Sequence, residues 1–238
     1  MSKPSRILGV LGGMGPLATV DFLQKLIEET PASHDQEHLP VIAYSVPQMP
    51  DRPPAIIGHG ESPLPHMLAG IHTLKRAGAQ AVAIACNTAH YWFDDLVQQG
   101  GLPILHIADA ACAALVDTRA GPAVQRAGLL ATQGTVAAGF YQSRFHARGI
   151  ECLLSSNADQ QTLVLPAIEC VKRNDLAQAH ALASQAARHL LDQGAQSIVL
   201  ACTEIPLAIE HQTSDVSGRC IDATRALARA CVAWWRAA

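Results

Sequence analysis

Short apolar runs alternate with longer amphipathic segments along the 238 residues of the chain. The apolar runs lack a hydrophobic–polar alternation, which is typical of strands buried on both faces. They predict strands at residues 6–12, 41–46, 81–85, 103–107, 126–131, 150–154, 197–201 and about 219–221. Apolar positions at helical spacing predict helices at residues 17–30, 64–77, 109–118, 136–148, 175–193 and 222–236. This alternation predicts an α/β fold of parallel sheets flanked by helices.

Two parts of the chain repeat one design. Residues 78–90 read GAQAVAIACNTAH and residues 194–206 read GAQSIVLACTEIP, so each runs a predicted buried strand into a cysteine. GVLGGMGPLATVDF at 9–22 lies against GLLATQGTVAAGFY at 128–141 with a similar offset along the chain. The repeat predicts two pseudosymmetric lobes, each a parallel sheet flanked by helices.

Each predicted lobe contributes one cysteine at the end of a strand. The first lobe comprises residues 1–112 and 222–238 and carries Cys86; the second comprises residues 113–221 and carries Cys202. Ligands of open parallel sheets bind beyond the carboxyl ends of the strands. We therefore expect an active site in the cleft between the lobes, where the two thiols approach one small molecule from opposite sides.

Composition excludes several classes of partner. The 49% of apolar residues can supply a core, and 17 Lys and Arg against 20 Asp and Glu leave a formal charge of −3. The basic residues are scattered, which argues against nucleic acid and acidic membranes as partners. No stretch approaches a membrane span, and we expect no secretory signal. Seven cysteines, an odd number without a C-x-x-C pair, indicate a reducing cytoplasm rather than a disulfide or zinc framework.

The residues that follow the two cysteines suit acid–base chemistry. Asn87 and Thr88 open one predicted helix, and Thr203 and Glu204 open another. Backbone N–H groups at a helix start can hold a carboxylate, and the helix dipole lowers the pKa of a nearby thiol. With a carboxylate held between two thiols, one sulfur can remove the α-proton while the other protonates the opposite face. This arrangement predicts racemisation of a small amino acid by two bases without a cofactor.

Five sequence blocks also carry a family resemblance, in the order LGVLGGMGPLAT, DQEHLPVIAYSVPQMPDR, ACNTAH, LLATQGT and ACTEIP. Through them the sequence resembles the aspartate racemase branch of the aspartate/glutamate racemase superfamily over essentially its whole length. The resemblance implies a pyridoxal-independent racemase that acts on aspartate or a related amino acid, with Cys86 and Cys202 as the acid/base pair. It also implies a homodimer that needs neither cofactor nor metal.

The resemblance assigns further roles in substrate binding. Arg52, with Asp51 beside it, matches the family arginine that meets a distal carboxylate, and Lys172 matches its substrate-recognising lysine. A buried second carboxylate needs such cations, because burial of an unpaired charge is costly. Ala201 and Ser45 depart from residues common in the family, which makes the racemase chemistry firmer than the choice of aspartate.

The loop after the first predicted strand is expected to line the substrate site with Gly13 and Met14. Its segment GMGPLA satisfies a permissive dinucleotide-binding motif, but the second strand ends without the acidic residue that would bind ribose. Thr132 occupies the corresponding loop of the second lobe and is expected to help bind the substrate α-carboxylate. Glu204 is expected to bind the substrate ammonium group or to tune the neighbouring thiol.

Other interpretations compete with a racemase. HDQEH at 34–38 has the letters of a zinc-protease motif, but the prolines at 31 and 40 leave too little room for the required helix. His90 could orient the Cys86 loop. A broad-specificity epimerase, an isomerase of the same superfamily and a non-catalytic amino-acid-binding sensor remain alternatives. A sensor does not need two opposed bases, and binding without α-proton exchange would favour it.

Overall fold

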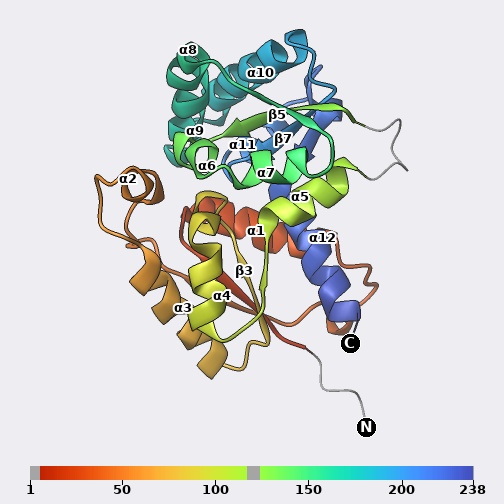
Figure 1. Ribbon diagram of the computed structural model, residues 1–238. Helices are drawn as coiled ribbons and strands as arrows, with labels where there is room; N and C mark the ends of the chain where they lie inside the picture. Colours follow the sequence, from red (N-terminus) through yellow and green to blue (C-terminus); the bar gives the residue numbers. More distant parts are fainter. Residues whose placement is uncertain (1–5, 117–123, 238) are drawn as a thin grey trace.

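The computed structural model describes residues 6–116 and 124–237, which form two four-stranded parallel sheets (Figure 1). The first sheet has the order β2-β1-β3-β4, with β1 Leu8–Gly12, β2 Val41–Ser45, β3 Ala81–Ile84 and β4 Ile104–Leu105. The second has the order β6-β5-β7-β8, with β5 Arg126–Ala131, β6 Glu151–Leu154, β7 Ser197–Ala201 and β8 Cys220–Asp222. The equivalent strand orders confirm the α/β fold with two similar lobes.

Helices surround both sheets. The α-helices are α1 Pro16–Glu28, α2 Arg52–Ile56, α3 Leu64–Arg76, α4 Phe93–Gly100, α5 Ile107–Leu115, α6 Gln133–Ala138, α7 Phe140–His146, α8 Asn157–Asp159, α9 Leu165–Lys172, α10 Leu176–Asp192, α11 Ile205–Glu210 and α12 Ala223–Arg236. Shorter 3-10 helices are η1 Asp35–Glu37, η2 Thr88–Trp92 and η5 Ser217–Arg219, and a π-helical turn, η4 Gln160–Val164, precedes α9. None of the helices in the described ranges combines the length and hydrophobicity of a bilayer span.

The central strands are buried and the outer strands are not. Every residue of β1 and β3 is buried, whereas β2 and β6 are partly or fully exposed at each position. Burial on both faces explains why the central strands read as continuous apolar runs rather than alternating ones. One core cluster joins the lobes, because Leu8 and Phe22 of the first half belong to the same cluster as Leu129 and Tyr141 of the second.

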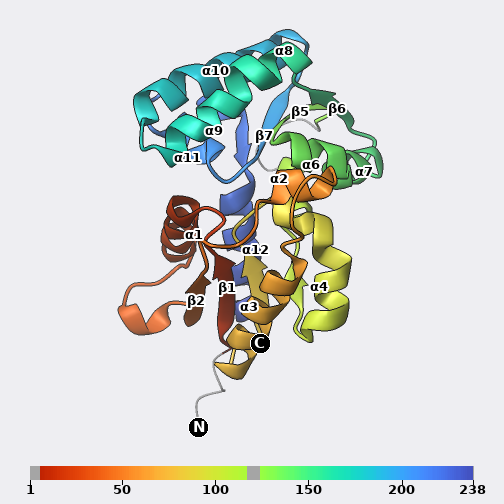
Figure 2. The same cartoon turned by 90° about the vertical axis from the view of Figure 1, so that its left-hand side faces the viewer.

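The last helix returns to the first half of the molecule. In Figures 1 and 2, α12 lies in the same half as β1 and α1, and it packs against α1 and α5. The expected boundary after residue 112 falls inside α5, and the last two positions of the predicted helix 109–118 lie outside the described residues. The domain limits therefore stay a prediction.

The predicted helix 136–148 is in fact two helices. Gly139 adopts a left-handed conformation, with φ of 72°, and separates α6 from α7. Left-handed backbone ends a helix, and glycine adopts it without a Cβ penalty. The break turns α7 so that its fully buried Tyr141 faces the first lobe, where its hydroxyl contacts Asn87.

Candidate active site

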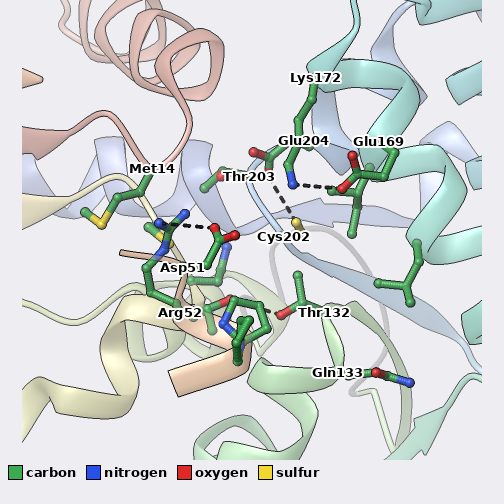
Figure 3. Close-up of a pocket in the computed structure, with 17 residues that line it drawn as sticks. Met14, Asp51, Arg52, Thr132, Gln133, Glu169, Lys172, Cys202, Thr203 and Glu204 are labelled. Carbon is green, nitrogen blue, oxygen red and sulfur yellow. Dashed lines mark hydrogen bonds and ion pairs between the residues drawn. The ribbon is translucent and has the colours of Figure 1, made fainter. Parts of the chain in front are cut away.

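A cavity of about 220 Å³ lies between the lobes (Figure 3). Its walls come from both halves of the chain: Met14, Asp51, Arg52, Pro53, Pro54, Cys86, Asn87, Thr88, Thr132, Gln133, Leu165, Ile168, Glu169, Lys172, Cys202, Thr203 and Glu204. Cys86 follows β3 and Cys202 follows β7, the equivalent central strands of the two sheets. The repeated strand–cysteine pattern thus brings both thiols to one cavity.

Cys202 is a buried thiol that is hydrogen-bonded to its neighbour Glu204. Its Sγ donates to Glu204 Oε2 at 3.1 Å, and Thr203 Oγ1 donates to the same oxygen at 3.2 Å. Burial and the adjacent Glu204 carboxylate hold the pKa of Cys202 well above its ordinary value, although the Glu204 backbone N–H acts in the opposite direction. The expectation that the helix start lowers this pKa is wrong for Cys202 because burial outweighs the helix dipole.

The loop that carries Cys86 is fixed by His90. His90 Nδ1 lies 2.9 Å from the Cys86 carbonyl oxygen, and the Ile107 N–H donates to Nε2 at 3.3 Å. One nitrogen must donate and the other must accept, so the ring is neutral with its proton on Nδ1. Burial lowers the pKa of His90 to about 4, so the ring stays neutral at neutral pH. His90 therefore has the orienting role expected for it.

Three hydroxyl groups join the lobes, and two of them, those of Thr88 and Thr132, belong to residues that line the cavity. Thr88 Oγ1 lies 3.0 Å from Thr132 Oγ1 and 2.9 Å from Thr135 Oγ1, and the Thr132 and Thr135 hydroxyls are 3.0 Å apart. Thr132 also caps α6, because its Oγ1 accepts from the Thr135 N–H at 3.1 Å. The cap fixes the Thr132 hydroxyl beside Thr88 at the cavity wall.

Asn87 stands between Cys86 and Thr88 in the sequence and is 2% exposed. Its Oδ1 accepts a hydrogen bond from the Tyr141 hydroxyl at 2.6 Å. Its Nδ2 is buried and has no hydrogen-bond partner among the described residues. Asn87 is thus a residue of the cavity wall with a buried, unused donor.

Two cations reach the cavity, and each has a carboxylate partner. Arg52 begins α2, and its Nη1 donates to the Pro50 carbonyl at 3.2 Å and lies 3.8 Å from the Asp51 carboxylate. Lys172 ends α9 and donates to Glu169 Oε1 at 2.9 Å. Figure 3 shows the lysine pair above the Cys202 sulfur and the arginine pair to the left of it.

The loop that follows β1 contributes Met14, but not Gly13, to the wall of the cavity. Met14 is 2% exposed and lines the cavity, whereas Gly13 is outside the lining residues. Gly13 has φ of 91°, and a Cβ at this position would overlap the Val46 backbone. The expectation that Gly13 lines the site is corrected: its lack of a side chain lets the loop pass close to β2.

Several lining residues were not predicted, and the clearest is Glu169. Residues 169 and 172 are three apart on a helix, a spacing at which opposite charges pair. This signal is in the sequence, but the helix that carries it, α9, was not predicted.

The HDQEH segment contains the single turn η1, and none of the residues of this turn is buried. Over residues 6–116 and 124–237, no group of three or more His, Cys, Asp or Glu side chains is placed to hold a metal ion.

Comparison with known proteins identifies the family. A model of the Asp/Glu/Hydantoin racemase family matches residues 11–231, which is most of the chain. The chain belongs to this racemase family. It is similar to the Picrophilus torridus aspartate racemase, with a TM-score of 0.85, 31% identity, and coverage of 97% of this chain and 94% of that one. An aspartate racemase homologue from Pyrococcus horikoshii gives a TM-score of 0.74 at 25% identity, covering 98% and 100% of the two chains.

A curated relative adds a second kind of racemase. The broad specificity amino-acid racemase RacX of Bacillus subtilis is 28% identical over 237 residues, which cover 97% of this chain and 99% of the relative. Membership of the racemase family identifies the chain as an isomerase and confirms the family resemblance of its sequence blocks. The two-lobed fold is also that of a Francisella tularensis glutamate racemase, with a TM-score of 0.70 at 16% identity.

Proposed function

We propose that this racemase is a pyridoxal-independent amino-acid racemase in which Cys86 and Cys202 exchange the α-proton. The supporting observation is that two cysteines at equivalent strand ends of two similar lobes line one cavity. A core position would explain either thiol alone. It would not explain why both repeats end at the same cavity.

The proposed reaction is a balanced transfer of protons. One sulfur, as thiolate, takes the α-proton, and the electron pair of the broken C–H bond moves towards the α-carboxylate. The other sulfur, as thiol, gives its proton to the opposite face of the α-carbon and is left as thiolate. The substrate is inverted, nothing is oxidised or reduced, and proton exchange with water restores the starting state.

The resting structure favours Cys202 as the proton donor. Its raised pKa keeps it protonated at neutral pH, and Glu204 accepts its hydrogen bond. For the opposite enantiomer Cys202 must lose its proton, and Glu204 Oε2 at 3.1 Å is the nearest acceptor described. Glu204 therefore lets one thiol serve in both directions.

The polar walls supply two binding regions. Asn87, Thr88, Thr132 and Thr203 hold the α-carboxylate in this proposal, beside the two thiols. Arg52 and Lys172 receive a distal carboxylate, because a buried carboxylate needs a cation. Aspartate or a close relative fits both regions, and the similarity to the Picrophilus torridus aspartate racemase supports it.

A broad-specificity racemase is the second candidate, and the ion pairs favour it. Asp51 and Glu169 already neutralise the two cations, and Glu204 adds a further carboxylate to the same walls. Less positive charge is then left for a distal carboxylate, so uncharged side chains can compete with aspartate. The likeness to the broad specificity racemase of Bacillus subtilis agrees with this alternative.

Solvent exchange at the α-carbon tests both candidates. The protein is incubated in D₂O under reducing conditions with L-aspartate and with a panel of other L-amino acids, and NMR follows loss of the Cα–H signal while chiral chromatography follows the D-enantiomer. Deuterated D-product from aspartate alone supports the first candidate, and product from several amino acids supports the second. Binding without exchange across the panel would favour the sensor and contradict the proposed function.

We also propose that the enzyme is a cytoplasmic homodimer. Leu17, Val20 and Ile27 lie on one side of α1 and are 41%, 61% and 61% exposed, which offers an apolar surface to a second copy. Light scattering should give the mass of a dimer for the wild type and of a monomer for the pair of changes Val20→Asp and Ile27→Asp. A monomeric wild type would contradict the proposal.

A further inference from the structure

Tyr141 is a buried side chain that reaches the site from the opposite lobe. It lies on α7, is 0% exposed, and donates its hydroxyl proton to Asn87 Oδ1 at 2.6 Å. Phe140 and Phe145 pack against its ring, with centroids 5.2 Å and 6.1 Å away, so the ring has little freedom to turn. The proton transfer proposed above makes no use of this hydroxyl.

The hydrogen bond determines which end of the Asn87 amide is left free for a ligand. An asparagine amide has an oxygen that accepts and a nitrogen that donates two protons. The tyrosine hydroxyl occupies Oδ1, and Nδ2 is left buried without a partner among the described residues. A buried donor without a partner is costly, so this one is expected to have a ligand acceptor.

The opposite orientation of the amide would work against binding. A half-turn about the last side-chain bond would leave Oδ1 as the free end, and this oxygen would repel a carboxylate. The Tyr141 hydroxyl favours the useful orientation because its proton must go to an acceptor. Burial raises the pKa of Tyr141 well above its usual range, so the hydroxyl keeps that proton.

We propose that Tyr141 is a positioning residue for substrate binding: its hydroxyl fixes the Asn87 amide so that Nδ2 donates to the α-carboxylate. This inference rests on the proposed function for the identity of the ligand. It explains the presence of a hydroxyl group between two phenylalanine rings. It also gives α7 of the second lobe a role in positioning a binding residue of the first lobe.

The test replaces one hydroxyl and measures binding. Tyr141→Phe removes the hydroxyl and keeps the ring, and Tyr44→Phe makes the same change at an exposed position on β2 as the matched control. Calorimetry measures the Kd of the panel amino acid that binds the wild type most tightly, so the result does not depend on turnover. We expect a rise of about tenfold for Tyr141→Phe and no change for Tyr44→Phe.

A double-mutant cycle with Asn87→Ala separates positioning from a general structural effect. If Tyr141 acts through Asn87, Tyr141→Phe should change Kd by less than about twofold in the Asn87→Ala background. Equal factors in the two backgrounds, or a Kd for Tyr141→Phe close to that of the wild type, would overturn the inference. A wild type that binds amino acids but never exchanges the α-proton would contradict the proposed function while this cycle still tests Tyr141.

Discussion

At the scale of single residues, Glu204 controls the protonation of the Cys202 thiol. Its Oε2 accepts from both the Cys202 thiol and the Thr203 hydroxyl, and it is only 7% exposed. The sequence alone left two roles for it, binding the substrate ammonium or tuning the thiol. The hydrogen bond to Sγ supports the second role, because a negative charge beside a thiol opposes its ionisation.

Glu204→Gln should slow racemisation by at least about tenfold, because an amide, unlike a carboxylate, cannot take the proton from the Cys202 thiol. Burial is the larger cause of the raised Cys202 pKa and stays in place, but removal of the neighbouring charge should still lower that pKa. Cys202 should therefore react with iodoacetamide at lower pH in the variant, as followed by mass spectrometry of its peptide. Glu151→Gln, an exposed change on β6, is the control, and identical pH profiles for Glu204→Gln and the wild type would refute this role.

The elements that could be predicted are those whose pattern is local. The bounds of β5 and β7 were predicted correctly because each strand has one polar residue followed by a short, buried apolar run. α2, with the sequence RPPAI, is too short to show a helical period, and α9 spans only 8 residues. Helices of this kind become visible only when the rest of the fold packs around them.

The same distinction between local and long-range signals applies to the residues of the site. Cys86 and Cys202 were predicted from a repeated motif, and the structure brings them to one cavity. Tyr141 could not be predicted, because its partner Asn87 is 54 residues away and belongs to the other lobe. Glu169 was missed for a simpler reason, since its pairing with Lys172 depends on a helix that was not predicted.

The link that His90 makes between the Cys86 loop and α5 should make the protein sensitive to acid. Burial lowers the pKa of His90 to about 4 from a value near 6.5. Below pH 6.5 the unfolded chain binds a proton that the folded protein resists, so the stabilisation is full above 6.5 and is lost as the pH falls towards 4. The free energy of unfolding should then fall by about 1.4 kcal/mol per pH unit from this residue alone.

Urea unfolding between pH 7 and pH 4 measures this slope. His90→Gln should reduce it by the contribution of one proton, whereas His59→Gln, at an exposed position, should leave it unchanged. His106, whose pKa burial and the nearby His90 lower to about 2, adds to the slope over the same range and remains in both variants. An unaltered slope in His90→Gln would contradict the assignment.

At the scale of the whole molecule, the lobes are joined by a buried charge cluster as well as by apolar packing. Lys25 of α1 is 1% exposed, and its Nζ lies 2.8 Å from Asp21 and 2.7 Å from Asp222 at the end of β8. Burial opposes the charge on Lys25, but the two aspartates outweigh it and raise the pKa of the amine. The cluster ties a helix beside the first sheet to the last strand of the second.

Lys25→Met should lower the free energy of unfolding by about 3 kcal/mol, because it leaves buried carboxylates without their cation. The control is Arg229→Met on α12, which removes an exposed arginine from its pair with Glu29 and should cost less than about 1 kcal/mol. Denaturant unfolding at neutral pH compares the two. Equal losses would show that the buried cluster does not stabilise the contact between the lobes.

The central claim is that two opposed thiols perform the racemisation, and the most direct measurement is α-deuterium incorporation with enantiomer ratio in D₂O for Cys86→Ala and Cys202→Ala. Cys152→Ala, on β6 and outside the cavity, is the matched control. The account predicts that each active-site variant loses racemisation by at least about a hundredfold while the control keeps the wild-type rate. Racemisation near the wild-type rate in either active-site variant would contradict it.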